Sequence, residues 1–203
     1  LLLSDGSFRR FPDDTNPAGH FSSMLCLDIE MDASGNLWIA TDGGGLIVMD
    51  SVTGDTRTYR HGSTQLVSDF LTDVELGEKG AWIGSVDNGL RFARFDSPSV
   101  TNPHFGQFQG RPVYSLLEVD SQNLWFSAQN SIYRLGIVSG ELERYDASHG
   151  IQPGELNANV STILEDGRVV FGGSGGITVF DPSLVEKNKN IPRLIIEGVG
   201  LDN

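Results

Sequence analysis

The sequence is poor in basic residues, cysteine and long apolar runs, and each shortage excludes a class of protein. It has 14 Lys and Arg against 27 Asp and Glu, and this net charge of −13 argues against a nucleic-acid or anionic-membrane partner. We find neither an apolar run of roughly 18 residues, as a membrane helix needs, nor a signal peptide. Cys26 stands alone, so an intramolecular disulfide is impossible, and its apolar surroundings predict a buried side chain.

Signatures of catalysis are also missing from the sequence. The chain contains no Gly-x-Ser-x-Gly elbow, no Walker phosphate loop, no His-Glu-x-x-His motif and no paired-cysteine metal site. The Gly-rich stretch at 172–176 is not followed by Lys and leads into a predicted strand, so we interpret it as a turn. The sequence therefore predicts no active site, metal or cofactor.

Glycine, by contrast, is abundant, and a Gly-rich phrase recurs along the chain. "GNLWIATDGGGLIVMD" at 35–50 returns as "GAWIGSVDNGLRFARFD" at 80–96 and, less closely, as "NLWFSAQNSIYRLG" at 123–136. Trp38, Trp82 and Trp125 hold the same place in these copies, 44 and 43 residues apart, and Phe171 holds it in a fourth copy. The chain therefore consists of four copies of one unit.

Each unit has the period-two pattern of short β-strands. In the first copy we predict strands at about 24–31, 36–41, 45–50 and 55–60, with glycines where the chain reverses. Four antiparallel strands in about 40–45 residues are typical of a β-propeller blade, and the recurring Trp is large enough to fill the space between blades. We predict an all-β propeller of about four four-stranded antiparallel blades with a partial one, as a fragment of a larger propeller.

The repeats also suggest how the chain is divided. Residues 1–19 look like the end of a preceding blade, residues 20–190 hold the four repeats, at about 20–60, 61–103, 104–148 and 149–190, and residues 191–203 form a link into a new strand. An open array of blades would expose an apolar face at each end. We therefore expect further blades, or a second copy of the chain, to cover these faces.

The phrase "GNLWIATDGGGL", with "SMLCLDIEMDAS" before it and "YRHGSTQLVSDFLTDV" after it, resembles the two-component-regulator propeller repeat. This repeat is found in the extracytoplasmic sensor regions of bacterial hybrid histidine kinases and of related diguanylate-cyclase sensors. The segment from residue 167 onward is similar to the last blade of such sensors, where the chain passes into an immunoglobulin-like β-sandwich. The third copy departs most from the pattern, because "AQNS" replaces the Gly-rich turn.

The resemblance implies a periplasmic module of an inner-membrane receptor. Its small-molecule ligand, often a carbohydrate in gut-bacterial members, would bias the arrangement of paired sensors, and the kinase or cyclase output would lie outside this sequence. Two alternatives stay open at this point. One is a propeller lyase or hydrolase with His61 or His149 as its base, and the other is an interaction scaffold without a small ligand.

Candidate ligand-binding residues are predicted on one face of the disc. Successive strands of a blade alternate in direction, so the links between blades and the turns between second and third strands emerge on the same face. The candidates are the link histidines His20, His61, His104 and His149, and the turn residues Asp42, Asp87, Asn88, Gln129 and Asn130. A plainer interpretation competes, because repeats place like residues alike and Asp and Asn are common in turns. The blades would hold the histidines too far apart to share one metal.

Carboxylates recur late in the first strand of the units. Glu30, Glu75 and Glu118 hold equivalent places, and Asp28 and Asp73 lie two residues before the first two of them. These groups could form an acidic channel that attracts cations, or a solvated wall of the disc. We favour the solvated wall.

Overall fold

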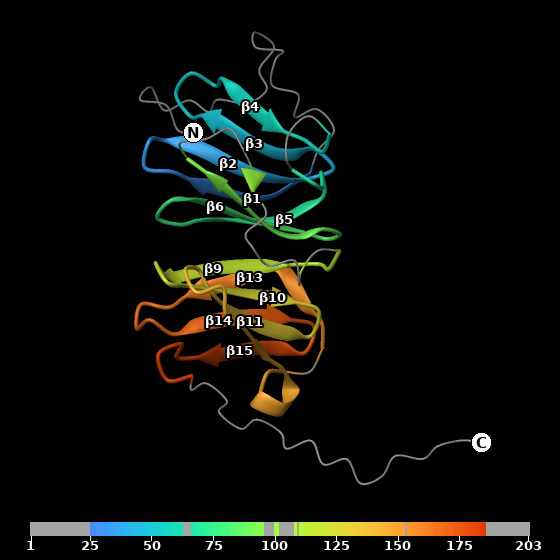
Figure 1. The fold of residues 1–203 in the computed structure, drawn as a ribbon, viewed down its shortest axis with the longest axis vertical. Coiled ribbons are helices and arrows are strands. Elements are labelled where there is room, and N and C mark those ends of the chain that lie inside the picture. The colour runs from blue at the N-terminus through green and yellow to red at the C-terminus, as the bar shows by residue number, and fades with distance from the viewer. Residues whose placement is uncertain are drawn as a thin grey trace, which may run out of the picture.

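Four antiparallel sheets follow one another along the chain in the computed structural model (Figure 1). The structure describes residues 25–62, 66–95, 100–101, 108, 110–152 and 154–185. Within these residues three sheets have four strands and the last has three, and every strand pairs with its neighbour in sequence. The predicted all-β propeller architecture is therefore confirmed.

The strand bounds of the first blade agree with the predicted ones to within one residue at each end. Blade I comprises β1 (Leu25–Met31), β2 (Asn36–Asp42), β3 (Gly45–Asp50) and β4 (Thr56–Tyr59). Blade II comprises β5 (Leu71–Leu76), β6 (Gly80–Ser85), β7 (Gly89–Arg94) and β8 (Val100–Thr101). Blade III comprises β9 (Ser115–Asp120), β10 (Asn123–Ala128), β11 (Ser131–Gly136) and β12 (Leu142–Tyr145). Blade IV comprises β13 (Leu156–Ile163), β14 (Val169–Gly173) and β15 (Gly176–Phe180), and the 3-10 helix η2 (Ala147–His149) precedes it.

Two glycines at the starts of third strands are required by their surroundings. Gly45 and Gly89 have φ values of +75° and +74°, in the left-handed region. A Cβ on Gly45 would lie 2.2 Å from the carbonyl oxygen of Tyr59, and one on Gly89 would lie 1.9 Å from that of Phe108. Glycine at these two positions thus lets another segment of backbone, the end of β4 beside Gly45 and Phe108 beside Gly89, pass close to the turn.

The hydrophobic core is divided into three clusters, one at each junction between successive blades. Trp38 packs with Val74 of blade II, Trp82 packs with residues of blade III, and Trp125 packs with Phe171 of blade IV. All four of these rings are at most 4% exposed. Each second-strand aromatic residue therefore lies at a blade junction, where it removes a large apolar surface from water.

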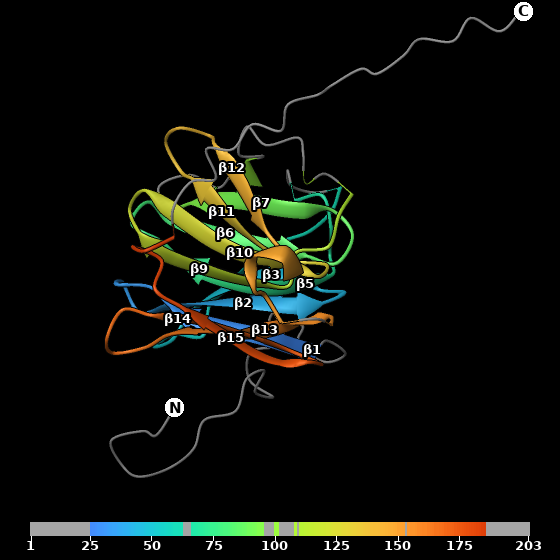
Figure 2. The same ribbon diagram turned by 90° about the horizontal axis from the view of Figure 1, so that it is seen from below.

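The first strands of the four blades lie together at the inside of the array. β5 packs against both β1 and β9, and β9 packs against β13. Asn159 of β13 returns to the first blade, because its Nδ2 donates to the carbonyl oxygen of Leu27 and to Oδ1 of Asp28, both at 2.9 Å. Figure 2 looks along the array from below, with β13 nearer to the viewer than β1. The first and last described blades thus meet at their inner strands.

The predicted apolar face at each end of the array is present. Leu25, Ile29 and Met31 of β1 are 65%, 54% and 64% exposed, and Ile177 of β15 is 67% exposed. The prediction of a buried Cys26 is wrong, because this residue is exposed on β1. The blade of β1 packs against the following blade, but within the described residues no blade precedes it. What covers these faces stays a prediction.

Several predictions fall outside the part of the chain that the structure describes. They are the segments 1–19 and 191–203, together with His20 and His104. Within the described ranges, no helix has the length and apolar character needed to cross a membrane.

Candidate functional site

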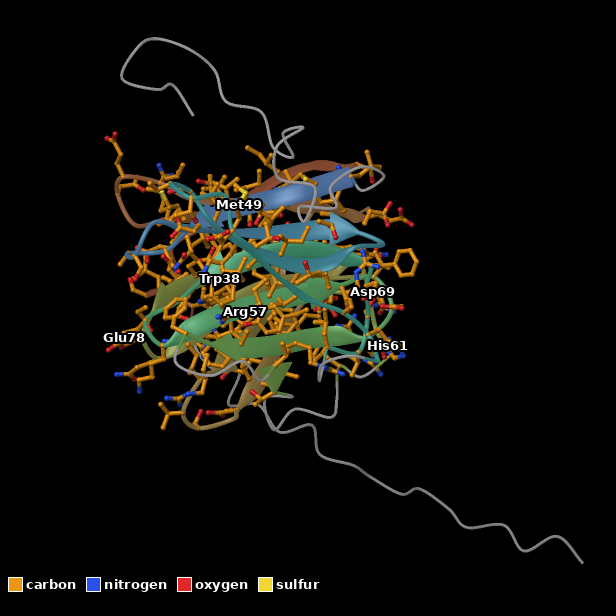
Figure 3. The ribbon with its side chains drawn as sticks, turned by 90° about the horizontal axis from the view of Figure 1, so that it is seen from above. Trp38, Met49, Arg57, His61, Asp69 and Glu78 are labelled. Carbon is orange, nitrogen blue, oxygen red and sulfur yellow. The ribbon has the colours of Figure 1, made fainter. Side chains whose placement is uncertain are left out.

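The links between blades and the turns between second and third strands meet on one face, as predicted. The backbone N–H of Gly43 donates to the carbonyl oxygen of Asp69 at 2.9 Å, and that of His61 donates to the Asp69 carboxylate at 2.7 Å. In the next blade, Asn88 Nδ2 donates to the Val67 carbonyl oxygen at 3.1 Å. Figure 3 shows His61 and Asp69 at one edge of the molecule and Glu78 at the opposite edge.

The described candidate residues of this face are spread over different blades. Asp42, the last residue of β2, is exposed, as are the turn residues Asp87, Gln129 and Asn130, and Asn88 is half-buried. Sequence reasoning missed Asp69, which ties His61 to the first Gly-rich turn, because nothing in its spacing distinguishes it from other loop aspartates. Ligand contact by any of these residues stays a prediction.

His149 lies at the edge of an aromatic hollow of about 290 Å³ between blades III and IV. Trp125, Tyr145 and Phe180 supply the rings, with the Trp125 and Tyr145 centroids 5.5 Å apart in a stacked pair. The His149 ring meets Tyr145 edge-on, with centroids 5.6 Å apart. Of the described candidates on the predicted face, His149 alone lines this hollow.

A local capping arrangement fixes the position of His149. The Asp146 side chain accepts from the Ser148 backbone N–H at 3.0 Å, and its Oδ1 lies 3.2 Å from His149 Nδ1. Gly150 follows with φ +88° and ends the short helix. Hydrogen bonds from Ser148 lower the pKa of Asp146 to about 2, so this carboxylate stays ionised and holds the imidazole in place.

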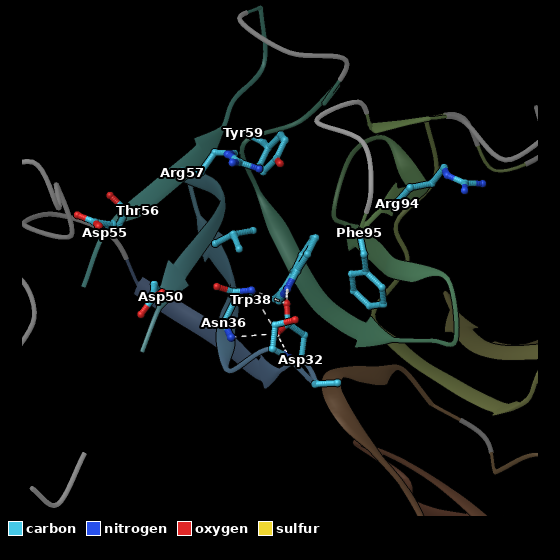
Figure 4. Close-up of a pocket in the computed structure, with 13 residues that line it drawn as sticks. Asp32, Asn36, Trp38, Asp50, Asp55, Thr56, Arg57, Tyr59, Arg94 and Phe95 are labelled. Atoms are coloured by element: carbon cyan, nitrogen blue, oxygen red, sulfur yellow. Dashed lines mark hydrogen bonds between the residues drawn. The ribbon is translucent and has the colours of Figure 1, made fainter. Parts of the chain in front are cut away.

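A larger groove of about 410 Å³ lies at the opposite ends of the strands, beside Trp38 (Figure 4). Trp38 Nε1 donates to Asp32 Oδ2 at 2.9 Å, and the Trp38 and Phe95 rings meet edge-on with centroids 5.5 Å apart. Asn36 and Arg57 add polar groups to the lining. Sequence reasoning overlooked this groove, because Phe95 belongs to the next repeat and only packing brings it to Trp38.

The interpretation of a solvated wall of carboxylates is wrong for Asp73, which is buried. Asp73 is 4% exposed, and its Oδ2 accepts the backbone N–H of Leu116 at 2.7 Å. Glu75 Oε1 accepts the backbone N–H of Glu118 at 2.9 Å, and Glu118 Oε2 accepts Trp82 Nε1 at 2.6 Å. These carboxyl groups are therefore acceptors that join one blade to the next.

Burial changes the protonation of two of these groups. Burial and the neighbouring Asp28 raise the pKa of Asp73 to about 9, and burial raises the pKa of Glu75 to about 7. Among the described residues, no group of three or more His, Cys, Asp and Glu side chains could hold a metal ion.

Sequence comparison finds one curated relative and no family model that matches the chain. Histidine kinase P4 of Formosa agariphila is 21% identical over 196 residues. The match covers 93% of this chain and 14% of the kinase. The chain thus spans a small part of the length of this relative.

Solved structures share the fold at low sequence identity. The extracellular domain of a protein described as a one-component system of B. thetaiotaomicron matches with a TM-score of 0.65 and 18% identity, over 80% of this chain and 21% of that one. The extracellular domain of a hybrid two-component system of the same organism matches with a TM-score of 0.52 and 17% identity, over 79% of this chain and 28% of that one. The designed protein Ika4 matches with a TM-score of 0.60 and 16% identity, over 80% of this chain and 93% of that one. The resemblance to sensor propellers of two-component systems is thereby confirmed for the fold.

Proposed function

We propose that the chain is a ligand-sensing propeller module in the periplasmic part of a bacterial two-component-type receptor. The observation that carries the proposal is the bladed fold, which the chain shares with the extracellular domains of two bacterial signalling systems. The similarity to a histidine kinase supports the same role. Ligand binding on the propeller would be transmitted to a signalling domain elsewhere in the receptor, and the module itself would catalyse no reaction.

The ligand site of this proposal is the aromatic hollow beside His149. Trp125, Tyr145 and Phe180 offer apolar surfaces, and His149 and Thr178 offer hydrogen-bonding groups. Few polar groups on an aromatic lining are typical of small-molecule sites. A carbohydrate suits this lining, because a sugar ring has an apolar face that packs on aromatic rings and hydroxyls that bond at its edge.

Signalling would follow from a shift in population between arrangements of paired receptors. A ligand can favour one arrangement only if it binds that arrangement more tightly than the other. The hollow lies at the junction of blades III and IV, with contributions from both. Occupancy would therefore stabilise one packing of these two blades, and the rest of the receptor would respond to that packing.

The proposal is tested by thermal unfolding of the 203-residue chain against a panel of neutral and acidic mono- and disaccharides. A ligand at a hundred times its Kd stabilises the folded state by about 2.7 kcal/mol, which gives a measurable rise in Tm. We expect at least one sugar to raise the Tm, and His149→Ala to abolish the rise. His61→Ala is the matched control and should retain it. A rise that His61→Ala removes and His149→Ala retains would place the site elsewhere, and no rise with any sugar would contradict a carbohydrate ligand.

A further inference from the structure

The groove beside Trp38 is separate from the hollow beside His149, because it lies between blades I and II and the hollow lies between blades III and IV. Three aromatic residues line the groove: Trp38, Tyr59 and Phe95. Phe95 is 44% exposed, so part of a large apolar ring faces water there. A ligand that covered this ring would gain the free energy of removing it from water.

The Trp38 ring is held in a fixed place at the groove. Its Nε1 donates to Asp32 Oδ2 at 2.9 Å. Asp32 Oδ1 accepts the backbone N–H groups of Ser34 and Asn36, each at 2.9 Å. These bonds fix the Asp32 carboxylate and, through it, the indole ring. A site whose ring is already in place loses less conformational freedom when a ligand binds.

The other aspartates of the groove are also engaged by local donors. Asp50 Oδ1 accepts two backbone N–H groups of the turn that follows it, both at 2.8 Å. Asp55 Oδ2 accepts the Thr53 hydroxyl at 3.0 Å. Figure 4 shows Asp50 and Asp55 on the side of the groove away from Phe95. These aspartates thus complete turns of blade I and lie apart from the exposed ring.

Arg57 brings unused hydrogen-bond donors to the groove. It lies opposite Val48 in the sheet, and Val48 lies opposite Trp38, so the three side chains share one face of blade I. The Arg57 side chain is exposed, and no described residue makes a hydrogen bond or an ion pair with it. A guanidinium has five N–H donors in a planar fork that fits a carboxylate. Arg94, at the end of β7, brings a second guanidinium to the lining.

The corresponding places in blades II and III lack this free guanidinium. The fourth-strand residue in line with Trp82 is Thr101. The fourth-strand residue in line with Trp125 is Glu143. Glu143 forms an ion pair with Arg134, so that guanidinium already has a carboxylate partner. Among the three described four-stranded blades, blade I thus differs in the residue that its fourth strand places in line with the recurring Trp.

We propose that the Trp38 groove is a second binding site, for a small ring compound that carries a carboxylate. The carboxylate pairs with Arg57, and the ring packs against Phe95. An acidic sugar and an aromatic acid share this chemistry, because each combines a carboxylate with a ring face of low polarity. Arg57 belongs to blade I and Phe95 to blade II, so the bound ligand joins these two blades.

The proposal is tested by NMR of the folded 203-residue chain, through the indole N–H signal of Trp38. We expect glucuronate or benzoate to shift this signal in a saturable way. The uncharged glucose and benzamide should bind at least about tenfold more weakly, because they lack the charge-assisted bond to Arg57. A shift by glucuronate alone identifies an acidic sugar as the ligand class, and a shift by benzoate alone identifies an aromatic acid. No saturable shift with either probe would overturn the proposal.

Variants locate the two contacts of the ligand. Arg57→Gln should weaken binding of the probe at least about tenfold. Arg111→Gln is the matched control, because it removes the same charge from an exposed side chain outside the groove, and it should bind as the wild type does. Phe95→Ala should also weaken binding, because it removes the exposed ring. Unchanged binding in Arg57→Gln, or an equal loss in Arg111→Gln, would overturn the proposal.

A further variant keeps this site apart from the proposed ligand site. His149→Ala alters the hollow between blades III and IV and leaves the Trp38 groove intact. We expect it to bind the probe as the wild type does, so a failure of the hollow as a sugar site would not affect this result. Loss of the Trp38 shift in folded His149→Ala would contradict a separate site.

Discussion

β1 and β5 occupy the same place in successive repeats, yet their surroundings differ. Both contain an Asp-x-Glu sequence, with Ile29 and Val74 between the two acids. Val74 is completely buried, whereas Ile29 is 54% exposed. β5 packs against β1 of the preceding blade and β9 of the following one, whereas β1 packs against β2 of its own blade and β5 of the following one. The same local pattern is thus an interior strand in one blade and an uncovered strand in another, because the neighbours decide its burial.

The largest expected effect comes from placing a charge at the matched positions of the two strands. Val74→Asp would bury a carboxylate in the apolar cluster around Trp38, and we expect it to cost more than about 4 kcal/mol and to leave the chain unfolded. Ile29→Asp, the matched variant, should cost less than about 1 kcal/mol, because its side chain stays in water. Urea unfolding followed by tryptophan fluorescence measures both. Equal costs would show that β1 is as well covered as β5.

The second effect concerns the glutamates of the same two strands. The folded pKa of Glu75 is about 7, above its ordinary value of 4.5, so its contribution to stability is lost as pH rises from about 4.5 to 7. This loss corresponds to roughly 3 kcal/mol. Glu75→Gln should abolish that part of the pH dependence while keeping an acceptor for the Glu118 N–H. Glu30→Gln should change the pH dependence of stability less than Glu75→Gln does. Chemical denaturation at a series of pH values tests the pair, and a larger effect at Glu30 would reverse the comparison.

A smaller effect is expected where blade IV meets β1. Asn159 donates to Leu27 and Asp28 and has φ +51°. Asn159→Ala removes both hydrogen bonds and places alanine in the left-handed region, so we expect a loss of about 1–2 kcal/mol. Asn159→Gly, which relieves the backbone, should lose about half as much. The neighbouring exposed Asn157→Ala is the control and should stay within about 0.5 kcal/mol of the wild type in urea unfolding.

The smallest perturbation is chemical labelling of Cys26, which leaves the fold unchanged. Because this thiol is exposed on β1, we expect one equivalent of a thiol reagent to react with the folded chain without denaturant. Partial burial raises its pKa and will slow the reaction relative to a free thiol. Protection of Cys26 in the folded chain, reversed by urea, would mean that another blade or a second copy of the chain covers β1.

Much of the fold could be predicted from local pattern. The period-two strands, the Gly-rich turns and the recurring Trp predicted the strand bounds of blade I and the antiparallel blades that the structure shows. The alternation of strand direction also predicted that the links between blades meet the turns between second and third strands. The contacts of Asp69 with Gly43 and His61 show this meeting. These features depend on near neighbours in sequence, which a repeat displays directly.

The candidate site was less accessible to prediction. His149 was singled out by its place in a link, but the hollow beside it depends on Trp125 and Phe180, which come from two blades. The Trp38 groove depends in the same way on Phe95 of the following repeat. A pattern within one repeat cannot show which rings of two repeats meet, because the packing angle between blades determines that.

The sequence by itself determined the repeated unit, its strands and turns, and the aromatic residue that each unit places on its second strand. These follow from side-chain alternation and from the backbone freedom of glycine, which act over a few residues. Only the tertiary structure decided that Asp73 is buried and accepts a hydrogen bond from blade III while Cys26 and Ile29 are exposed. Burial depends on what lies across the blade junction, and the residues found there come from another repeat: Val74 lies 46 positions from Asp28, and Leu116 lies 43 positions from Asp73.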